Sequence, residues 1–276
     1  MKNYNQSPLP FQGQKRRFLN EFKVALASFP EDAIYVDLFG GSGLLSHTVK
    51  QAKPEAKVVY NDFDGFSERL RNIPRTNLLL VDIREILKSG EKDKKVSEVQ
   101  KAAILARISK EVGFVDYITL SGSLLFSGKY AKSFEDLSKQ TFYNKPKQTD
   151  YVATGYLEGV EVVSKCYKEL FAHYASQPVV FLIDPPYLST DSSSYNSEGY
   201  WRLTDYLDVL TVLQNKNYFY FTSNKSSIIE LCEWMSSHSS YVNPFAGSGR
   251  VSVSGSVNYS AQYEDIMVYK KEVSSC

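Results

Sequence analysis

The sequence predicts an α/β protein whose sheet is mostly parallel, and three observations support this. Residues 33–37 and 179–183 are continuous apolar runs, which are typical of strands buried on both faces. The first run leads into a glycine-rich loop and then a helical pattern, as expected for strand–loop–helix units. Residues 241–270 contain apolar residues with a period of two, which predicts an antiparallel hairpin at the C-terminal edge of the sheet.

The length and composition of the chain limit the classes of protein to which it can belong. The chain has 276 residues, 43% of them hydrophobic, which is enough for one sizeable core plus an insertion. Its three cysteines are widely spaced without a Cys-x-x-Cys pair, so we expect free thiols in a reducing compartment. The histidines share no metal-ligand spacing, and no apolar run approaches the roughly 20 residues that span a bilayer. The expectation is a cytoplasmic protein without a metal or membrane partner.

The N-terminal segment contains a short loop followed by a helix. The loop, Pro-Leu-Pro-Phe-Gln-Gly-Gln-Lys, covers residues 8–15 and includes Phe11, Gly13 and Lys15. After it, apolar residues recur at helical spacing up to Pro30, which predicts an amphipathic helix. The stripe consists of Phe18, Phe22, Leu26 and Phe29.

The strand at 33–37 ends in an acid and a loop suited to binding an anion. Glycines let the backbone approach a ligand closely, and the positive end of the helix that starts at Leu44 faces the same place. The candidate ligand-binding residues here are Asp37, Phe39, Gly40, Gly41, Ser42 and Gly43.

The next strand, 58–60, ends in a second acidic group, Asn61-Asp62-Phe63-Asp64. An acid about twenty residues past a glycine loop is placed to accept hydrogen bonds from ribose hydroxyls. Asp62 is the first candidate and Asp64 the second. The Gly-x-Gly-x-x-Gly spacing of nicotinamide enzymes is absent, which disfavours hydride transfer.

A second glycine loop, residues 243–250, competes for the same role. It reads Asn-Pro-Phe-Ala-Gly-Ser-Gly-Arg, and the residues that follow, 251–257, alternate with period two. They therefore predict a strand, whereas an anion-binding loop should lead into a helix. We assign ligand binding to the first loop.

The apolar run at 179–183 ends in Asp184-Pro185-Pro186-Tyr187. Prolines cannot donate to a sheet ladder, so they end the strand, and ligands in open α/β sheets bind at the carboxyl ends of strands. The tetrapeptide offers a carboxylate, the Pro185 carbonyl and an aromatic ring, which together suit a flat ring bearing an amino group. The alternative is a proline turn in which Asp184 is a cap and Tyr187 packs against its neighbours.

Positive charge is concentrated between these two motifs. Residues 88–149 contain 12 Lys and Arg against 7 Asp and Glu, a net charge of +5, whereas the whole chain carries +1. Lysines interleaved with aromatic residues favour contact with phosphates and unstacked bases, although a solvated helical face would have the same composition. The candidate nucleic-acid-binding residues are Lys129, Tyr130, Lys132, Lys145, Lys147 and, in the Ser-rich stretch 189–200, Tyr195.

Together, the Asp-Pro-Pro-Tyr tetrapeptide, the Phe-x-Gly-x-Lys element at 11–15 and the order of the motifs resemble the Dam-like, D12-class DNA N6-adenine methyltransferases, including phage forms. The resemblance covers residues 8–64 and 160–270. It implies a Rossmann-like methyltransferase fold with helices on both faces of the sheet. It also implies a catalytic domain of residues 1–84 and 159–276, and a mainly helical target-recognition insertion at 85–158.

The resemblance further implies S-adenosyl-L-methionine as cofactor and double-stranded DNA as partner. The Phe11–Lys15 element would contact the methionine end of the cofactor, which also lies near Asp184. Asp184, Pro185, Pro186 and Tyr187 would be the catalytic residues, acting on an adenine flipped out of the duplex. Relatives often carry an acid that contacts the cofactor adenine, but this chain has Lys165-Cys166-Tyr167 at the candidate position.

Two other functions remain open at this point. Some ribosomal-RNA base methyltransferases share the tetrapeptide, and a catalytically silent relative could bind nucleic acid alone. The sequence does not distinguish a monomer from a weak dimer. It also does not distinguish a restriction–modification enzyme from a phage or an orphan enzyme.

Overall fold

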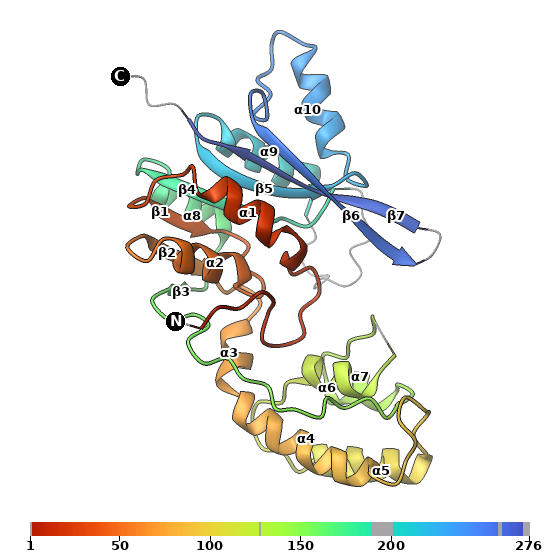
Figure 1. Ribbon diagram of the computed structural model, residues 1–276. Coiled ribbons are helices and arrows are strands. Elements are labelled where there is room, and N and C mark those ends of the chain that lie inside the picture. The colour runs from red at the N-terminus through yellow and green to blue at the C-terminus, as the bar shows by residue number, and fades with distance from the viewer. Residues whose placement is uncertain (1, 127, 189–200, 259–260, 273–276) are drawn as a thin grey trace.

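The computed structural model describes residues 2–126, 128–188, 201–258 and 261–272, which form one seven-stranded sheet with helices around it (Figure 1). The strand order is β3-β2-β1-β4-β5-β7-β6. Strands β1 to β5 are parallel, and the β6–β7 hairpin is antiparallel, with β7 pairing with β5. The strands are β1 Ile34–Asp37, β2 Lys57–Asn61, β3 Glu161–Val163, β4 Val179–Ile183, β5 Asn217–Ser223, β6 Gly249–Asn258 and β7 Ala261–Lys270. The predicted sheet is thereby confirmed, including its C-terminal hairpin.

Helices cover both faces of the sheet, which explains the unbroken apolar runs. All five residues of β4 are buried, because Val180 and Leu182 pack on one side and Phe181 and Ile183 on the other. The first side is covered by the short 3₁₀ helix η1 (Arg16–Phe18), α1 (Leu19–Leu26) and α2 (Leu44–Ala52). The second is covered by α8 (Tyr167–Tyr174), α9 (Leu203–Leu213) and α10 (Ile228–Ser236).

A second group of helices has a core of its own and lies below the sheet in Figure 1. It comprises α3 (Phe66–Arg71), α4 (Ile73–Leu87), α5 (Glu98–Ile108), α6 (Tyr117–Leu124) and α7 (Phe134–Ser138). Leu80 and Ile83 of α4 belong to the same buried cluster as Ile104 of α5. The boundary predicted between residues 84 and 85 therefore falls inside α4. The division into domains stays a prediction.

The parallel strands bring their carboxyl ends to one edge of the sheet. Asp37, the last residue of β1, is level with Tyr60 of β2 and with Leu182 of β4. Asp184 follows two residues after Leu182, so it lies just beyond the end of β1. The glycine loop and the Asp-Pro-Pro-Tyr tetrapeptide thus leave neighbouring strands at the same edge.

Candidate active site

Lys15 and Asp184 form an ion pair at this edge. The Lys15 Nζ contacts Asp184 Oδ2 and donates a hydrogen bond to the Gly13 carbonyl at 2.9 Å. It also lies 5.6 Å from the centre of the Tyr187 ring. The structure therefore brings the Phe-x-Gly-x-Lys element and the Asp-Pro-Pro-Tyr tetrapeptide into direct contact.

The second oxygen of the Asp184 carboxylate, Oδ1, is available to accept a hydrogen bond. Oδ1 is buried and accepts no hydrogen bond from the part of the chain that the structure describes. Burial raises the pKa of Asp184, and Lys15 opposes that rise. Asp265, in β7 and paired with Ser223 of β5, raises it further through its own charge. An acceptor of this kind favours a donor group from outside the chain.

Asp37 is a second carboxylate at the same edge, and its side chain is buried. Its Oδ2 accepts a hydrogen bond from the Ser46 hydroxyl at 2.7 Å, and its Oδ1 has no partner within the described residues. Burial raises the pKa of Asp37 to about 7, with the charge of Asp184 adding to the rise and the Ser46 hydrogen bond opposing it. Two carboxylates with unused oxygens thus lie near each other.

The glycine loop is tightly held by two tyrosines. A Cβ on Gly40 would lie 2.2 Å from two carbons of the Tyr60 ring, so only glycine fits there. Gly43 begins α2 with a φ of 72°, in the left-handed region. The Tyr60 hydroxyl lies 2.7 Å from the Gly41 carbonyl, and the Tyr156 hydroxyl donates to the Ser42 carbonyl at 3.0 Å. These contacts fix the loop backbone before any ligand arrives.

The remaining residues of the predicted cofactor set lie around this loop. Phe11 packs against Gly41, where a Cβ would be 3.1 Å from the Phe11 ring. The Phe39 ring packs with the rings of Tyr167 and Trp201. Its centre lies 5.2 Å from the centre of each. The candidate position for the cofactor adenine thus carries the Tyr167 ring beside Phe39.

Asp62 is buried and caps α3. Its Oδ1 accepts from the Phe66 amide at 2.6 Å and lies 3.0 Å from the Tyr60 hydroxyl, while its Oδ2 accepts from the Ser67 amide at 2.9 Å. An ionised carboxylate has about four lone-pair positions, so Oδ2 can still accept from a ribose hydroxyl. Asp64, the second candidate, is exposed.

Five of the six predicted nucleic-acid contacts lie in the helical region, by which we mean α3 to α7 and the segment between α7 and β3. Lys129, Tyr130, Lys132 and Lys147 are exposed, whereas Lys145 is half-buried. The Lys145 Nζ lies over the ring of Phe126 at 5.7 Å, and Phe126 is 61% exposed. Tyr195 and the rest of the Ser-rich stretch 189–200 lie outside the described residues.

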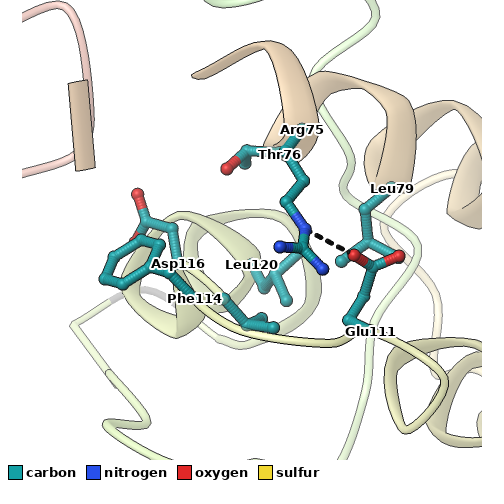
Figure 2. A pocket seen from close by; sticks show the side chains of 8 residues that line it. Arg75, Thr76, Leu79, Glu111, Phe114, Asp116 and Leu120 are labelled. Atoms are coloured by element: carbon teal, nitrogen blue, oxygen red, sulfur yellow. Dashed lines mark hydrogen bonds and ion pairs between the residues drawn. The ribbon is translucent and has the colours of Figure 1, made fainter. Parts of the chain in front are cut away.

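Two pockets are lined by neither Lys15 nor Asp184. The one in Figure 2, where Arg75 and Glu111 form an ion pair, encloses about 10 Å³ and so has room for about one water molecule. The other, about 280 Å³, lies between α8 and α9. No group of three or more His, Cys, Asp or Glu side chains in the described ranges could hold a metal ion. Within the same ranges no helix is long and apolar enough to cross a membrane.

The comparison with known families agrees with the geometry. Residues 11–219 match the D12 class N6 adenine-specific DNA methyltransferase family. The chain belongs to this family. The match runs from Phe11 through both motifs and also spans the insertion, which carried no motif of its own.

A similar protein covers nearly the whole chain of this D12-class methyltransferase. It comes from Haemophilus influenzae, is named "Putative methyltransferase", and is 40% identical over 98% of this chain and 93% of its own length. The resemblance inferred from the two motifs and their order is thereby confirmed, and with it the Rossmann-like fold class.

Sequence reasoning missed several residues that build the site. The sequence predicts Tyr60 only as part of a strand, and Tyr156, Phe66 and Arg69 are not among the predicted site residues. The contacts that join them to the glycine loop, to Phe11 and to Pro10 reach across 19 to 114 residues of chain, so no local pattern marks them. A buried tyrosine whose hydroxyl needs a partner is the one signal that Tyr60 offered.

Proposed function

We propose that this D12-class methyltransferase transfers a methyl group from S-adenosyl-L-methionine to the N6 amino group of an adenine flipped out of double-stranded DNA. The observation that carries the proposal is the unused Asp184 oxygen, at a sheet edge shared with the glycine loop. Family membership supports DNA as the substrate, in preference to ribosomal RNA.

The residues at this edge fit the cofactor. A backbone cradle without Cβ atoms at Gly40 and Gly41 suits the methionine carboxylate, and the unpaired Asp37 Oδ1 suits its ammonium group. Phe11, Gly13 and Lys15 would adjoin the methionine end, and Asp62 would accept from the ribose. When bound, the cofactor supplies an electrophilic methyl group.

The amino group of adenine is a poor nucleophile because its lone pair is delocalised into the ring. Asp184 Oδ1 and the Pro185 carbonyl can each accept one of its N–H bonds, which draws the nitrogen toward tetrahedral geometry and frees the lone pair. The carboxylate also stabilises the positive charge that develops on the nitrogen, and it can accept the proton that the nitrogen releases. The Tyr187 ring would stack on the base.

Lys15 has two consequences for this chemistry. Its ammonium group holds Asp184 Oδ2, which favours the ionised carboxylate against the effect of burial. It leaves Oδ1 for the incoming amine. Lys15 would therefore keep Asp184 in the state that accepts N–H bonds.

The helical region supports DNA as the partner. The exposed Phe126 ring, with Lys145 over it, suits an unstacked base, and the exposed Lys129, Lys132 and Lys147 suit phosphates. A base inside a duplex cannot reach Asp184, so the adenine must be flipped at a cost of a few kcal/mol.

The substrate is tested by tritium transfer from labelled S-adenosylmethionine onto duplex DNA and onto ribosomal RNA. We expect label in DNA, recovered as N6-methyladenine. Label confined to RNA would contradict the proposed substrate.

The role of Asp184 is tested by Asp184→Ala. Losing the acceptor and its charge should lower kcat on the order of a thousandfold, since electrostatic groups at a reacting centre contribute about that much. Cofactor affinity, measured by calorimetry, should change little. Asp208→Ala is a matched control, because Asp208 is an exposed acid paired with Lys168 on α8. Full activity of the Asp184 variant would exclude the assigned role.

A further inference from the structure

Arg69 of α3 is a buried charge where the sheet meets the helical region, and the predicted site does not include it. Its side chain is 6% exposed. The Nε donates to both carboxylate oxygens of Asp116, at 3.1 and 3.0 Å. The Nη2 donates to the Pro10 carbonyl at 2.9 Å and to the Thr119 hydroxyl at 3.2 Å. The Arg69 guanidinium therefore links α3 to the start of α6 and to Pro10, the residue before Phe11.

Helix α3 is also fixed to the cofactor side. Its first amides donate to Asp62, the candidate for the ribose. The Phe66 ring packs edge-on against Phe11 at 5.6 Å, and Phe11 in turn touches Gly41. A shift of α3 would therefore move both Asp62 and the 10–15 loop.

The other partner of Arg69 belongs to the helical region. Asp116 caps α6, accepting from the Thr119 amide at 3.0 Å. Helix α6 packs on the 10–15 loop, because a Cβ on Gly122 would lie 3.3 Å from the Pro10 ring. Two residues past α6 comes exposed Phe126, beside Lys145, one of the lysines proposed to contact DNA.

We propose that Arg69 is a positioning residue that couples DNA binding by the helical region to cofactor binding at the 10–15 loop and Asp62. Removing a buried guanidinium from its acceptors is costly, so the three segments that it joins move together. Coupling is reciprocal: DNA raises cofactor affinity by the factor by which cofactor raises DNA affinity. This inference rests on the proposed function.

The test measures a coupling factor. The DNA sequence that the enzyme methylates is first identified by sequencing DNA that it has modified. Calorimetry then gives the affinity for S-adenosylhomocysteine with and without a DNA duplex that carries this sequence. For the wild-type protein we expect DNA to raise the affinity about fivefold or more. For the double variant Arg69→Met with Asp116→Asn we expect a factor near 1. This variant removes both charges together, and the asparagine side chain that it introduces can still cap α6.

Two further variants separate positioning from folding. Arg75→Gln removes another arginine of the helical region, whose partner is Glu111, and it should leave the coupling factor unchanged. Thermal unfolding shows whether the double variant folds. If the double variant does not fold, the coupling factor is measured for Arg69→Lys in its place. Lysine keeps the charge but lacks the planar fork that joins Pro10 to Asp116. The coupling factor of Arg69→Lys should fall below that of the wild type.

Wild-type coupling in a folded Arg69 variant would overturn the inference. So would a wild-type protein that methylates DNA without any coupling. A wild-type protein that neither binds S-adenosylhomocysteine nor methylates DNA would instead contradict the proposed function, and the inference with it.

Discussion

At the scale of single residues, two carboxylates, buried Asp37 and half-buried Asp184, lie at the proposed site. Each has one oxygen paired and one unpaired within the described chain. Among the residues that the structure describes, a cation contacts Asp184 and not Asp37, so Asp184 is the better candidate for an ionised acceptor. Burial raises the pKa of both, which places protonation of the site closer to neutrality than in free aspartate.

This shift predicts how stability depends on pH. The pKa of Asp37 is about 7 in the folded protein against 3.8 ordinarily, so the folded state binds the extra proton between these values. The free energy of unfolding should therefore fall as pH rises through this window, by up to about 1.4 kcal/mol per pH unit from this group, and level off above it.

Asp37→Asn should flatten that slope. Urea unfolding at several values between about pH 4 and 7 checks the expected difference between variant and wild type. Asp32→Asn, at a neighbouring exposed acid, is the control and should leave the slope unchanged. Equal slopes in wild type and Asp37→Asn would show that the Asp37 carboxyl keeps an ordinary pKa.

At the scale of elements, the glycine loop and β2 are built as one unit. Tyr60 fills the space beside Gly40, and its hydroxyl lies between the Gly41 carbonyl and Asp62. The loop that would hold the methionine end is thus tied to the acid that would hold the ribose. This explains why the loop needs glycine for space at Gly40 and for a positive φ at Gly41 and Gly43.

Gly40→Ala should break this unit. The added Cβ would meet the Tyr60 ring and the Asn61 carbonyl, so we expect a loss of about 1–3 kcal/mol in unfolding free energy and at least tenfold weaker cofactor binding. Chemical unfolding and calorimetry measure the two effects. Adding Tyr60→Leu to the same chain should recover part of the stability. A single variant as stable as the wild type would contradict this account of the loop.

At the scale of the whole molecule, charge is divided between the two regions. Residues 88–149 carry a net charge of +5 in a chain of +1, so the rest of the protein is acidic. The long-range field therefore favours approach of a phosphate backbone to the helical region and not to the sheet. Figure 1 shows these helices as a group beside the site edge, joined to it through α3.

Lys129→Gln should weaken DNA binding and reduce its salt dependence. Each lost phosphate contact lowers the slope of log affinity against log salt concentration by about 0.9. Lys139→Gln, in the same region but paired with Glu135, is the control and should leave the slope unchanged. Binding titrations from low to moderate salt measure both. Identical slopes for Lys129→Gln and the wild type would place Lys129 outside the interface.

The sequence by itself determined β1, β2, β4, the C-terminal hairpin, the two glycine loops and which of these loops leads into a helix. These features depend on burial, turns and prolines, which neighbouring residues specify. Apolar runs gave β1 and β4, and period-two alternation gave the hairpin. It also identified Lys15 and Asp184, each through a local motif. The predicted boundary at residue 84 lies inside α4, whose apolar face packs in the helical core.

Only the tertiary structure decided which of these parts touch. The Lys15–Asp184 pair, the Tyr156 hydroxyl on Ser42 and the Arg69 bond to Pro10 join residues far apart in the chain. Such contacts depend on how parallel strands and helices pack in space, and not on the periodicity of any one segment. Local sequence therefore predicts the pieces of the site, while packing sets the distances on which its chemistry depends.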